Sequence, residues 1–298
     1  MIRGKGAPGA VPLILSCGVH GDELTPVPVV ETLLADLQAR RLLPLHPCLL
    51  IFANPPALAE RRRYLKHNLN RLFGAPMLPA SVEGQRARAL EQHCQEFTEL
   101  YGPGWHLDLH STIKPSRHAR FALQPQRNHP YDSRWPGVLA QAGFSALVHQ
   151  HSPAHTFAHF TCNQLGHDSF TLECGDIGGA AASGTNTLEP AQQTAALLDH
   201  FLRQLLTGPD LPATSPDGPV LQQYDVVVDL IRRSAGFRFH VDEQGENFAT
   251  FAQGTLIADD AGQPVTAPVD GCALLFANSQ VPVGDRAGLL LAPSLRTG

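Results

Sequence analysis

The sequence predicts an α/β fold in which a mixed central sheet is covered by helices, with a small β-rich domain after it in the chain. Three observations lead to this prediction. Apolar stretches of strand length alternate with stretches of helical periodicity through the first two thirds of the chain. A segment rich in Pro, Gly, Ser and Thr follows at 207–219, and short strand-like runs come after it. We therefore predict two domains, residues 1–208 and 209–298.

The predicted strands of the first domain are short apolar runs, as buried strands are. They lie at 11–17, 47–53, 105–109, 146–149 and 169–172. The predicted helices have apolar residues three and four positions apart, and lie at 25–37, 85–100 and 190–206. The predicted strands of the second domain lie at 224–230, 237–241, 254–257, 272–276 and 288–291. In such a sheet, ligands bind outside the carboxyl ends of the strands.

The composition favours a protein that acts on small molecules. Lys and Arg number 22 against 27 Asp and Glu, the net charge is −5, and no basic run exceeds 61–63, which argues against a nucleic-acid surface. No apolar run has the length of a membrane span, and we find no signal peptide at the start of the chain. The six cysteines are scattered, which is typical of reduced thiols. We therefore expect a cytoplasmic protein; its oligomeric state stays open.

Two predicted strands are followed by residues that bind metals. His20 and Glu23 come after the first strand, and His110 ends the strand that begins at 105. Two imidazoles and one carboxylate are the ligands of a hydrolytic Zn²⁺ site. The pair His20 and Glu23 alone, or His110 alone, would often occur without a metal. Asp108 lies on the same face of its strand as His110, so it either orients that imidazole or is an ordinary buried aspartate.

Further candidate site residues lie between Glu23 and Asp108 in the sequence, and after His110. An arginine fork with an adjacent asparagine, as in the segment 63–73, binds carboxylates, although a solvated basic loop has the same composition. Glu173 follows the apolar run 170–172 and precedes Gly175. A carboxylate that is partly desolvated there has a raised pKa and can transfer a proton between water and a leaving amine.

Five motifs in order resemble the succinylglutamate desuccinylase/aspartoacylase family. They are Gly-x-His-Gly-Asp-Glu at 18–23, Asn-Pro-x-Ala at 54–57, Arg-Tyr-x₃-Asn-Leu-Asn-Arg-Leu-Phe at 63–73, Asp-Leu-His-Ser-Thr at 108–112 and Thr-Leu-Glu-x-Gly at 171–175. The resemblance runs from about 16 to 291 and implies a zinc amidohydrolase with a carboxypeptidase-A-like catalytic domain. The segments at 105–110, 156–160 and 286–289 resemble the bacterial desuccinylase branch.

The resemblance also implies residue roles. One Zn²⁺ per chain is held by His20, Glu23 and His110. Glu173 acts as general base and acid, and Arg63 polarises the scissile carbonyl.

Substrate recognition is implied in the same way. Asn70 and Arg71 bind a carboxylate of a small acidic N-acyl amino acid, with N-succinylglutamate, from arginine catabolism, as the expected substrate. We expect His159 to line the acyl pocket. An aspartoacylase-like deacylase is the nearest alternative, but those enzymes use a tyrosine of the second domain, where only Tyr224 is present. A peptide-cleaving metallocarboxypeptidase and a non-catalytic zinc-binding protein are less favoured.

Several positions depart from the family pattern. Asn68 replaces an aspartate, and we expect this change to affect how Arg63 or Arg71 is held. Departures at Asp22, Leu24, Lys114, Pro115 and Asp176 are expected at the pocket rim. About ten residues precede the first strand, fewer than in family members, so an exposed sheet edge is expected. The histidines at 149, 151, 155, 159 and 167 form an alternative, less favoured metal site.

Overall fold

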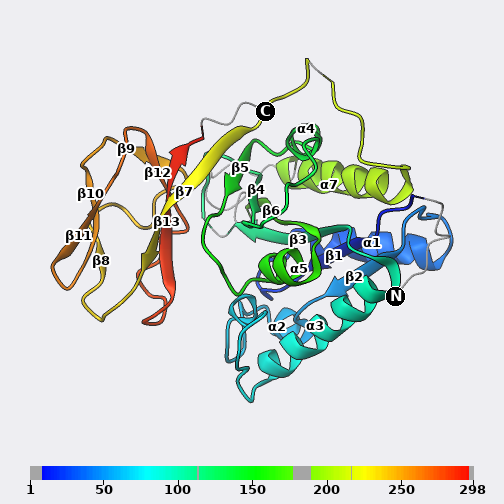
Figure 1. Ribbon diagram of the computed structural model, residues 1–298, viewed down its shortest axis with the longest axis horizontal. Helices are drawn as coiled ribbons and strands as arrows, with labels where there is room; N and C mark the ends of the chain where they lie inside the picture. The colour runs from blue at the N-terminus through cyan, green and yellow to red at the C-terminus, as the bar shows by residue number, and fades with distance from the viewer. Residues whose placement is uncertain (1–8, 113, 177–188, 216, 295–298) are drawn as a thin grey trace.

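A computed structural model describes residues 9–112, 114–176, 189–215 and 217–294, and shows a mixed sheet of ten strands (Figure 1). The strands in spatial order are β2 (Cys48–Phe52), β1 (Leu13–Cys17), β3 (Trp105–Thr112), β6 (Asp168–Asp176), β4 (Phe121–Gln124), β5 (Ala146–His149), β7 (Gln222–Ile231), β13 (Arg286–Pro293), β12 (Cys272–Leu275) and β9 (Ala249–Phe251). The strands from β2 to β6 are parallel, and β4 is antiparallel to β6. β2 lies at one edge of this sheet.

Helices pack against both faces of the sheet. They are α1 (Val27–Gln38), α2 (Pro55–Glu60), the 3₁₀ turn η1 (Leu69–Arg71), α3 (Val82–Tyr101), α4 (Trp135–Gln141), α5 (Phe157–Leu165) and α7 (Glu189–Thr207). One core cluster joins the sheet to α1, α4 and α7, and a second joins it to α3 and α5. None of the helices in the described ranges combines the length and apolarity of a membrane span. All six cysteines are buried, and none of them forms a disulfide.

The alternation of β3 places its polar residues on one face. Trp105, Leu107 and Leu109 pack into the core that contains α1 and α7. Because successive side chains of a strand point to opposite faces, His106, Asp108 and His110 face α5 instead. The His106 ring accordingly lies edge-on against Phe157 of α5, with the ring centroids 4.8 Å apart.

The C-terminal strands continue the central sheet. β7 pairs in parallel with β5 and antiparallel with β13, so the sheet runs from one part of the chain into the other. A separate three-stranded sheet of β8 (Arg238–Phe239), β10 (Leu256–Asp260) and β11 (Gln263–Thr266) packs beyond it. The division at 208/209 stays a prediction.

The predicted mixed α/β architecture with a β-rich C-terminal part is confirmed. Sequence analysis did not identify β4, α2, α4 or α5. These elements have four to nine residues, too few for a clear periodic pattern.

Candidate metal centre and substrate pocket

The loop after β1 is shaped by two glycines. Gly18 has a φ of +66°, which a residue with a side chain rarely adopts. A Cβ on Gly21 would lie 2.1 Å from the backbone carbon of Ala57, so only glycine allows this loop to approach α2. The close approach fixes the path of the segment that contains His20 and Glu23.

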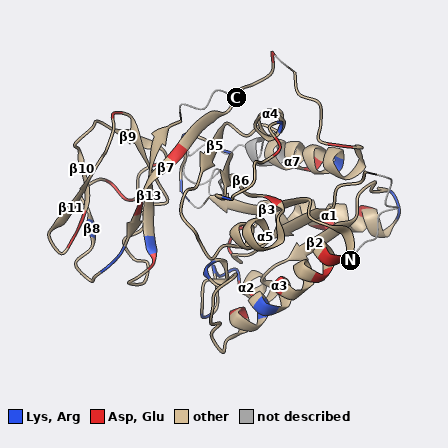
Figure 2. Cartoon of the chain, viewed as in Figure 1, with Lys and Arg blue, Asp and Glu red and all other residues tan. Residues whose placement is uncertain are grey.

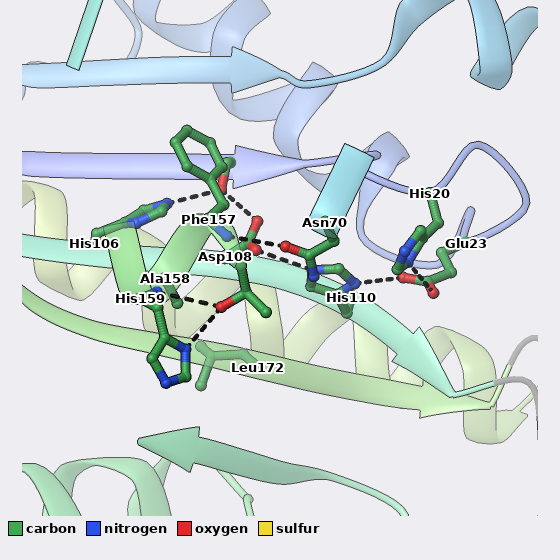
Figure 3. Close-up of polar contacts among 12 residues, drawn as sticks. His20, Glu23, Asn70, His106, Asp108, His110, Phe157, Ala158, His159 and Leu172 are labelled. Atoms are coloured by element: carbon green, nitrogen blue, oxygen red, sulfur yellow. Dashed lines mark hydrogen bonds and ion pairs between the residues drawn. The ribbon is translucent and has the colours of Figure 1, made fainter. Parts of the chain in front are cut away.

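Three predicted metal ligands converge on one point (Figure 3). His20 Nδ1 lies 2.7 Å from Glu23 Oε1, and His110 Nδ1 lies 2.7 Å from Glu23 Oε2. One nitrogen or oxygen from each side chain lies within 4.8 Å of the others, and all three residues are buried. The sheet and the loop after β1 therefore bring together residues that are far apart in the sequence.

A second set of oxygens contacts the outer nitrogens of both imidazoles. His110 Nε2 lies 2.9 Å from Asp108 Oδ2, and His20 Nε2 lies 3.0 Å from Asn68 Oδ1. Ser16 Oγ donates to the other Asp108 oxygen at 2.6 Å. These contacts turn both Nδ1 atoms toward Glu23, so of the two interpretations of Asp108 the geometry favours the orienting one.

The structure gives Asn68 contacts that sequence analysis did not predict. Asn68 contacts His20 and accepts a hydrogen bond from the backbone amide of Asn70, at 3.0 Å in each case. Its side chain replaces a carboxylate of the family pattern, yet the amide oxygen still accepts from the imidazole. The change therefore concerns a candidate metal ligand, and its effect on how Arg63 or Arg71 is held stays a prediction.

The ionisable groups of this centre shift one another's pKa values. Burial alone would raise the pKa of Glu23, but the charges of His20 and His110 outweigh it and hold that pKa well below its usual range. Burial lowers the pKa of His20, whereas the charges of Asp108 and Glu23 raise that of His110 despite burial. The carboxylate is thus ionised and suited to a cation.

Glu173 lies on β6 beside this centre. Burial first, and then the charge of Glu23, raises the pKa of Glu173 to about 8. Its Oε2 atom is buried without a hydrogen-bond partner. Leu172 and Cys174 on either side pack into the opposite core, which leaves Glu173 on the face of His110. The raised pKa agrees with the sequence prediction.

Arg63 lies on the loop before the 3₁₀ turn η1, and Asn70 and Arg71 lie within that turn. All three line the same cavity as Glu173. Arg63 Nη1 donates to Glu23 Oε1 at 2.9 Å. Arg71 Nη1 donates to the backbone oxygen of Asn70 at 2.8 Å, and the Asn70 side-chain oxygen accepts from the backbone amide of Phe157 at 2.9 Å. The loop is therefore tied both to the metal centre and to the start of α5.

A cavity of about 210 Å³ contains these groups. Its wall includes the three candidate ligands, Glu173 and the predicted substrate-binding residues Asn70 and Arg71, together with Arg63. Strand β13 adds Arg286, which sequence analysis did not name as a site residue although it opens the Arg-Ala-Gly-Leu segment at 286–289. Lys114 lies at the wall as expected and donates to backbone oxygens of Glu243 and Ala277, whereas the side chain of Asp176 lies outside the described residues.

His159 is not one of the residues that line the cavity, and its ring points away from the metal centre (Figure 3). Thr156, which does line the cavity, has its hydroxyl 2.9 Å from His159 Nδ1. Burial and the charge of Arg286 lower the pKa of His159 to about 4, so the imidazole is neutral at pH 7. A direct contact between His159 and an acyl group stays a prediction.

The alternative histidine site is not formed. His149 lies between the side chains of Gln124 and Gln223, and His151 pairs with Asp225. His167 instead contacts Thr98. Among the described residues, only the group of His20, Glu23 and His110 has metal-binding geometry. Figure 2 shows basic and acidic segments interspersed over the described chain, in keeping with the net charge of −5.

Comparison with known proteins identifies the family. Residues 10–205 match the succinylglutamate desuccinylase/aspartoacylase catalytic domain, and residues 219–294 match the AstE/AspA barrel-sandwich hybrid domain. The chain is 32% identical to succinylglutamate desuccinylase of Shewanella denitrificans over 95% of this chain and 81% of that protein. It is 36% identical to succinylglutamate desuccinylase of Serratia proteamaculans, over 96% of this chain and 85% of that protein.

A solved structure agrees with the same assignment. The crystal structure of the Vibrio parahaemolyticus succinylglutamate desuccinylase superposes with a TM-score of 0.86 at 28% identity, covering 98% of this chain and 84% of that one. Both domain matches, the sequence relatives and the shared fold lead to one conclusion. The chain belongs to the succinylglutamate desuccinylase/aspartoacylase family.

Proposed function

We propose that this protein is a zinc-dependent amidohydrolase that cleaves N-succinylglutamate into succinate and glutamate. The observation that supports it best is the convergence of His20, Glu23 and His110 in a cavity that also contains the buried acid Glu173. The names of the Shewanella and Serratia relatives supply the substrate. We further propose a cytoplasmic location, which the six buried cysteines without a disulfide support.

The side chains of the centre fit zinc. Two imidazoles and one carboxylate leave a fourth position open, as hydrolytic zinc sites require. Asp108 and Asn68 accept from the Nε2 atoms of His110 and His20, which leaves the Nδ1 atoms available as ligands. Bound zinc supplies a Lewis acid that lowers the pKa of a water molecule and polarises a carbonyl.

Glu173 moves the proton in this proposal. It takes a proton from water, the hydroxide that remains adds to the amide carbonyl carbon, and the carbon–nitrogen bond then breaks. Glu173 delivers the same proton to the departing nitrogen, so the carboxyl group returns to its starting state. Its pKa of about 8 is close to neutral pH, which suits a group that serves both as base and as acid.

The cationic residues stabilise and orient the substrate. Arg63 donates to the carbonyl oxygen as negative charge develops there; its guanidinium lies 2.9 Å from Glu23 and is thus already at the centre. Asn70 and Arg71 bind a substrate carboxylate through amide and guanidinium donors. A small dicarboxylic or tricarboxylic ligand therefore suits this cavity.

The aspartoacylase-like alternative has less support. The hydroxyl of Tyr224 lies 3.1 Å from His118 Nε2, and Tyr224 is buried in a separate core cluster. No tyrosine lies among the described residues of the cavity wall. A non-catalytic protein is also disfavoured, because Glu173 and all three candidate ligands are present and close together.

Steady-state hydrolysis by the zinc-loaded protein tests the proposal. We expect kcat/KM to be highest for N-succinylglutamate and much lower for N-acetylaspartate. A preparation of Glu173→Gln controls for contaminating hydrolases. Equal activity of that variant, or preference of the wild-type protein for N-acetylaspartate, would overturn the proposal.

A further inference from the structure

The C-terminal part of the chain contributes an arginine to the cavity. Arg286 is the first residue of β13, and its neighbour Ala287 is fully buried. The Arg286 side chain is 18% exposed and lines the same cavity as Glu173 and Arg71. A residue from the β-rich end of the sheet thus reaches the candidate active site.

The positive charge at this end of the cavity is only partly compensated. Arg286 Nη1 lies 3.6 Å from Asp229 Oδ1, which is longer than an ordinary charge-assisted hydrogen bond of about 2.7–2.9 Å. Arg71 donates to a backbone oxygen, and within the described ranges it forms no ion pair. Asp229 is thus the one carboxylate paired with Arg286, and the charge of Asp285 acts on Arg71 without an ion pair between them.

The two arginines also lie near each other. Burial, followed by the charge of Arg286, lowers the pKa of Arg71 to about 10. Buried cations are unfavourable unless an anion accompanies them. Guanidinium groups bind carboxylates with two parallel hydrogen bonds, and a ligand carboxylate would supply both the missing charge and the missing acceptors.

We propose that Arg286 and Arg71 together bind one carboxylate of the substrate, and that Arg286 determines specificity for acyl amino acids that have this acid group. The inference rests on the proposed amidohydrolase function. The competing explanation is that Arg286 and Asp229 form only a structural pair between β13 and β7. A structural pair would affect every substrate equally, whereas a binding residue affects only substrates that have the carboxylate it contacts.

Four substrates separate these explanations. N-succinylglutamate has three carboxylates, and N-butyrylglutamate, N-succinyl-γ-aminobutyrate and N-succinylnorvaline each lack a different one. We would measure kcat/KM for the wild-type protein, Arg286→Met, Arg71→Met and the double variant. Arg238→Met is the matched control, because Arg238 lies on β8 with a side chain that is 67% exposed.

We expect the wild-type protein to prefer N-succinylglutamate over one analogue by about 10- to 100-fold, the range of a charge-assisted contact. Arg286→Met and Arg71→Met should both abolish the preference for N-succinylglutamate over this same analogue. Both variants should keep the wild-type ratios of kcat/KM between N-succinylglutamate and the other two analogues. Arg286→Lys, which keeps the charge without the planar fork, should restore part of the lost preference. The control should behave as wild type.

Three results would overturn the inference. In the first, Arg286→Met lowers kcat/KM by the same factor for all four substrates. In the second, Arg286→Met and Arg71→Met each abolish the preference for N-succinylglutamate over a different analogue. In the third, Arg286→Met leaves every preference unchanged. If Arg286→Met does not fold, Arg286→Gln, which also removes the charge, provides the same comparison.

Binding without turnover distinguishes a failure of this inference from a failure of the proposed function. Absence of hydrolysis of all four substrates by the wild-type protein would refute the proposed function. Thermal stabilisation by succinate or glutamate would still test the contact: we expect at least one of them to stabilise the wild-type protein and Arg238→Met but not Arg286→Met. Equal stabilisation of all three, or of none, would refute the contact itself.

Discussion

His110 and Glu173 lie opposite each other in the register of the adjacent parallel strands β3 and β6. Both side chains point to the face of the sheet that contacts α5, because their neighbours Leu109 and Leu172 pack into the other core. The sheet itself therefore sets the spacing between a candidate metal ligand and the candidate proton carrier. The following variants test what this arrangement does.

Replacing Glu173 by Gln should remove activity without removing structure. The amide keeps the volume of the side chain but cannot accept a proton, so we expect kcat to fall by about 10²–10⁴-fold with little change in KM. Zinc content and the thermal midpoint should stay near the wild-type values. A fully active, zinc-replete variant would mean that Glu173 is a structural residue.

Replacing His110 by Ala should remove tightly bound zinc. His110 Nδ1 is one of the atoms that converge on the centre, and two protein ligands hold zinc much more weakly than three. Metal analysis after dialysis should give close to one equivalent for the wild-type protein and much less for the variant. His93→Ala is the control, because the side chain of His93 is 61% exposed on α3. A full equivalent in His110→Ala would contradict the assignment.

Replacing Asp108 by Asn should weaken zinc binding while leaving the ligands in place. The two Asp108 oxygens face two partners, Ser16 Oγ and His110 Nε2, and an amide has only one oxygen to offer. We expect a loss of about 10- to 100-fold in metal affinity, as for other residues that orient ligand imidazoles. Competition with a chelator measures it. Unchanged zinc affinity would show that Asp108 does not orient His110 and only stabilises the sheet through its contact with Ser16.

Arg63 and Arg71 should differ in their kinetic effects. Arg63 contacts Glu23 at the centre, so Arg63→Ala should mainly lower kcat. Arg71→Lys should mainly raise KM, because an ammonium cannot reproduce a bidentate contact and about 1–3 kcal/mol is at stake. Indistinguishable kinetic profiles for the two variants would mean that the roles are not separate.

The sequence predicted the ligands because their motifs are local. His20 and Glu23 are three residues apart and follow a clear apolar strand, and Asp108 and His110 share a strand face by simple alternation. Arg286 could not be placed in the same way. Its position in the cavity depends on β13 pairing with β7, and β7 with β5, which are long-range contacts that no local pattern encodes.

The contact of Asn68 with His20 was missed for a related reason. The residues are 48 positions apart, and their contact depends on how the loop before η1 folds. What holds that loop is a carboxylate of α3. Glu83 is fully buried, and its oxygens accept from the backbone amides of Leu65 and Lys66, at 2.7 and 3.2 Å, and of His67 at 3.4 Å.

Replacing Glu83 by Gln should destabilise the protein in a pH-dependent way. Burial alone would raise the pKa of Glu83, but the backbone amides outweigh it and lower that pKa in the folded state. The carboxylate therefore stabilises the fold above the pKa of the unfolded chain, about 4.3, and loses this effect as the pH falls through the lower folded-state pKa. We expect Glu83→Gln to lower the free energy of unfolding by about 1–3 kcal/mol at pH 7, since an amide cannot accept from all three donors.

The difference in the free energy of unfolding between this variant and the wild-type protein should shrink below about pH 4.3, because the glutamine does not titrate while the glutamate becomes protonated. Denaturant unfolding of both proteins at several pH values measures this difference, and Glu96→Gln, whose side chain is 51% exposed on the same helix, is the control. A difference that stays constant with pH would show that the charge of Glu83 is not what holds the loop.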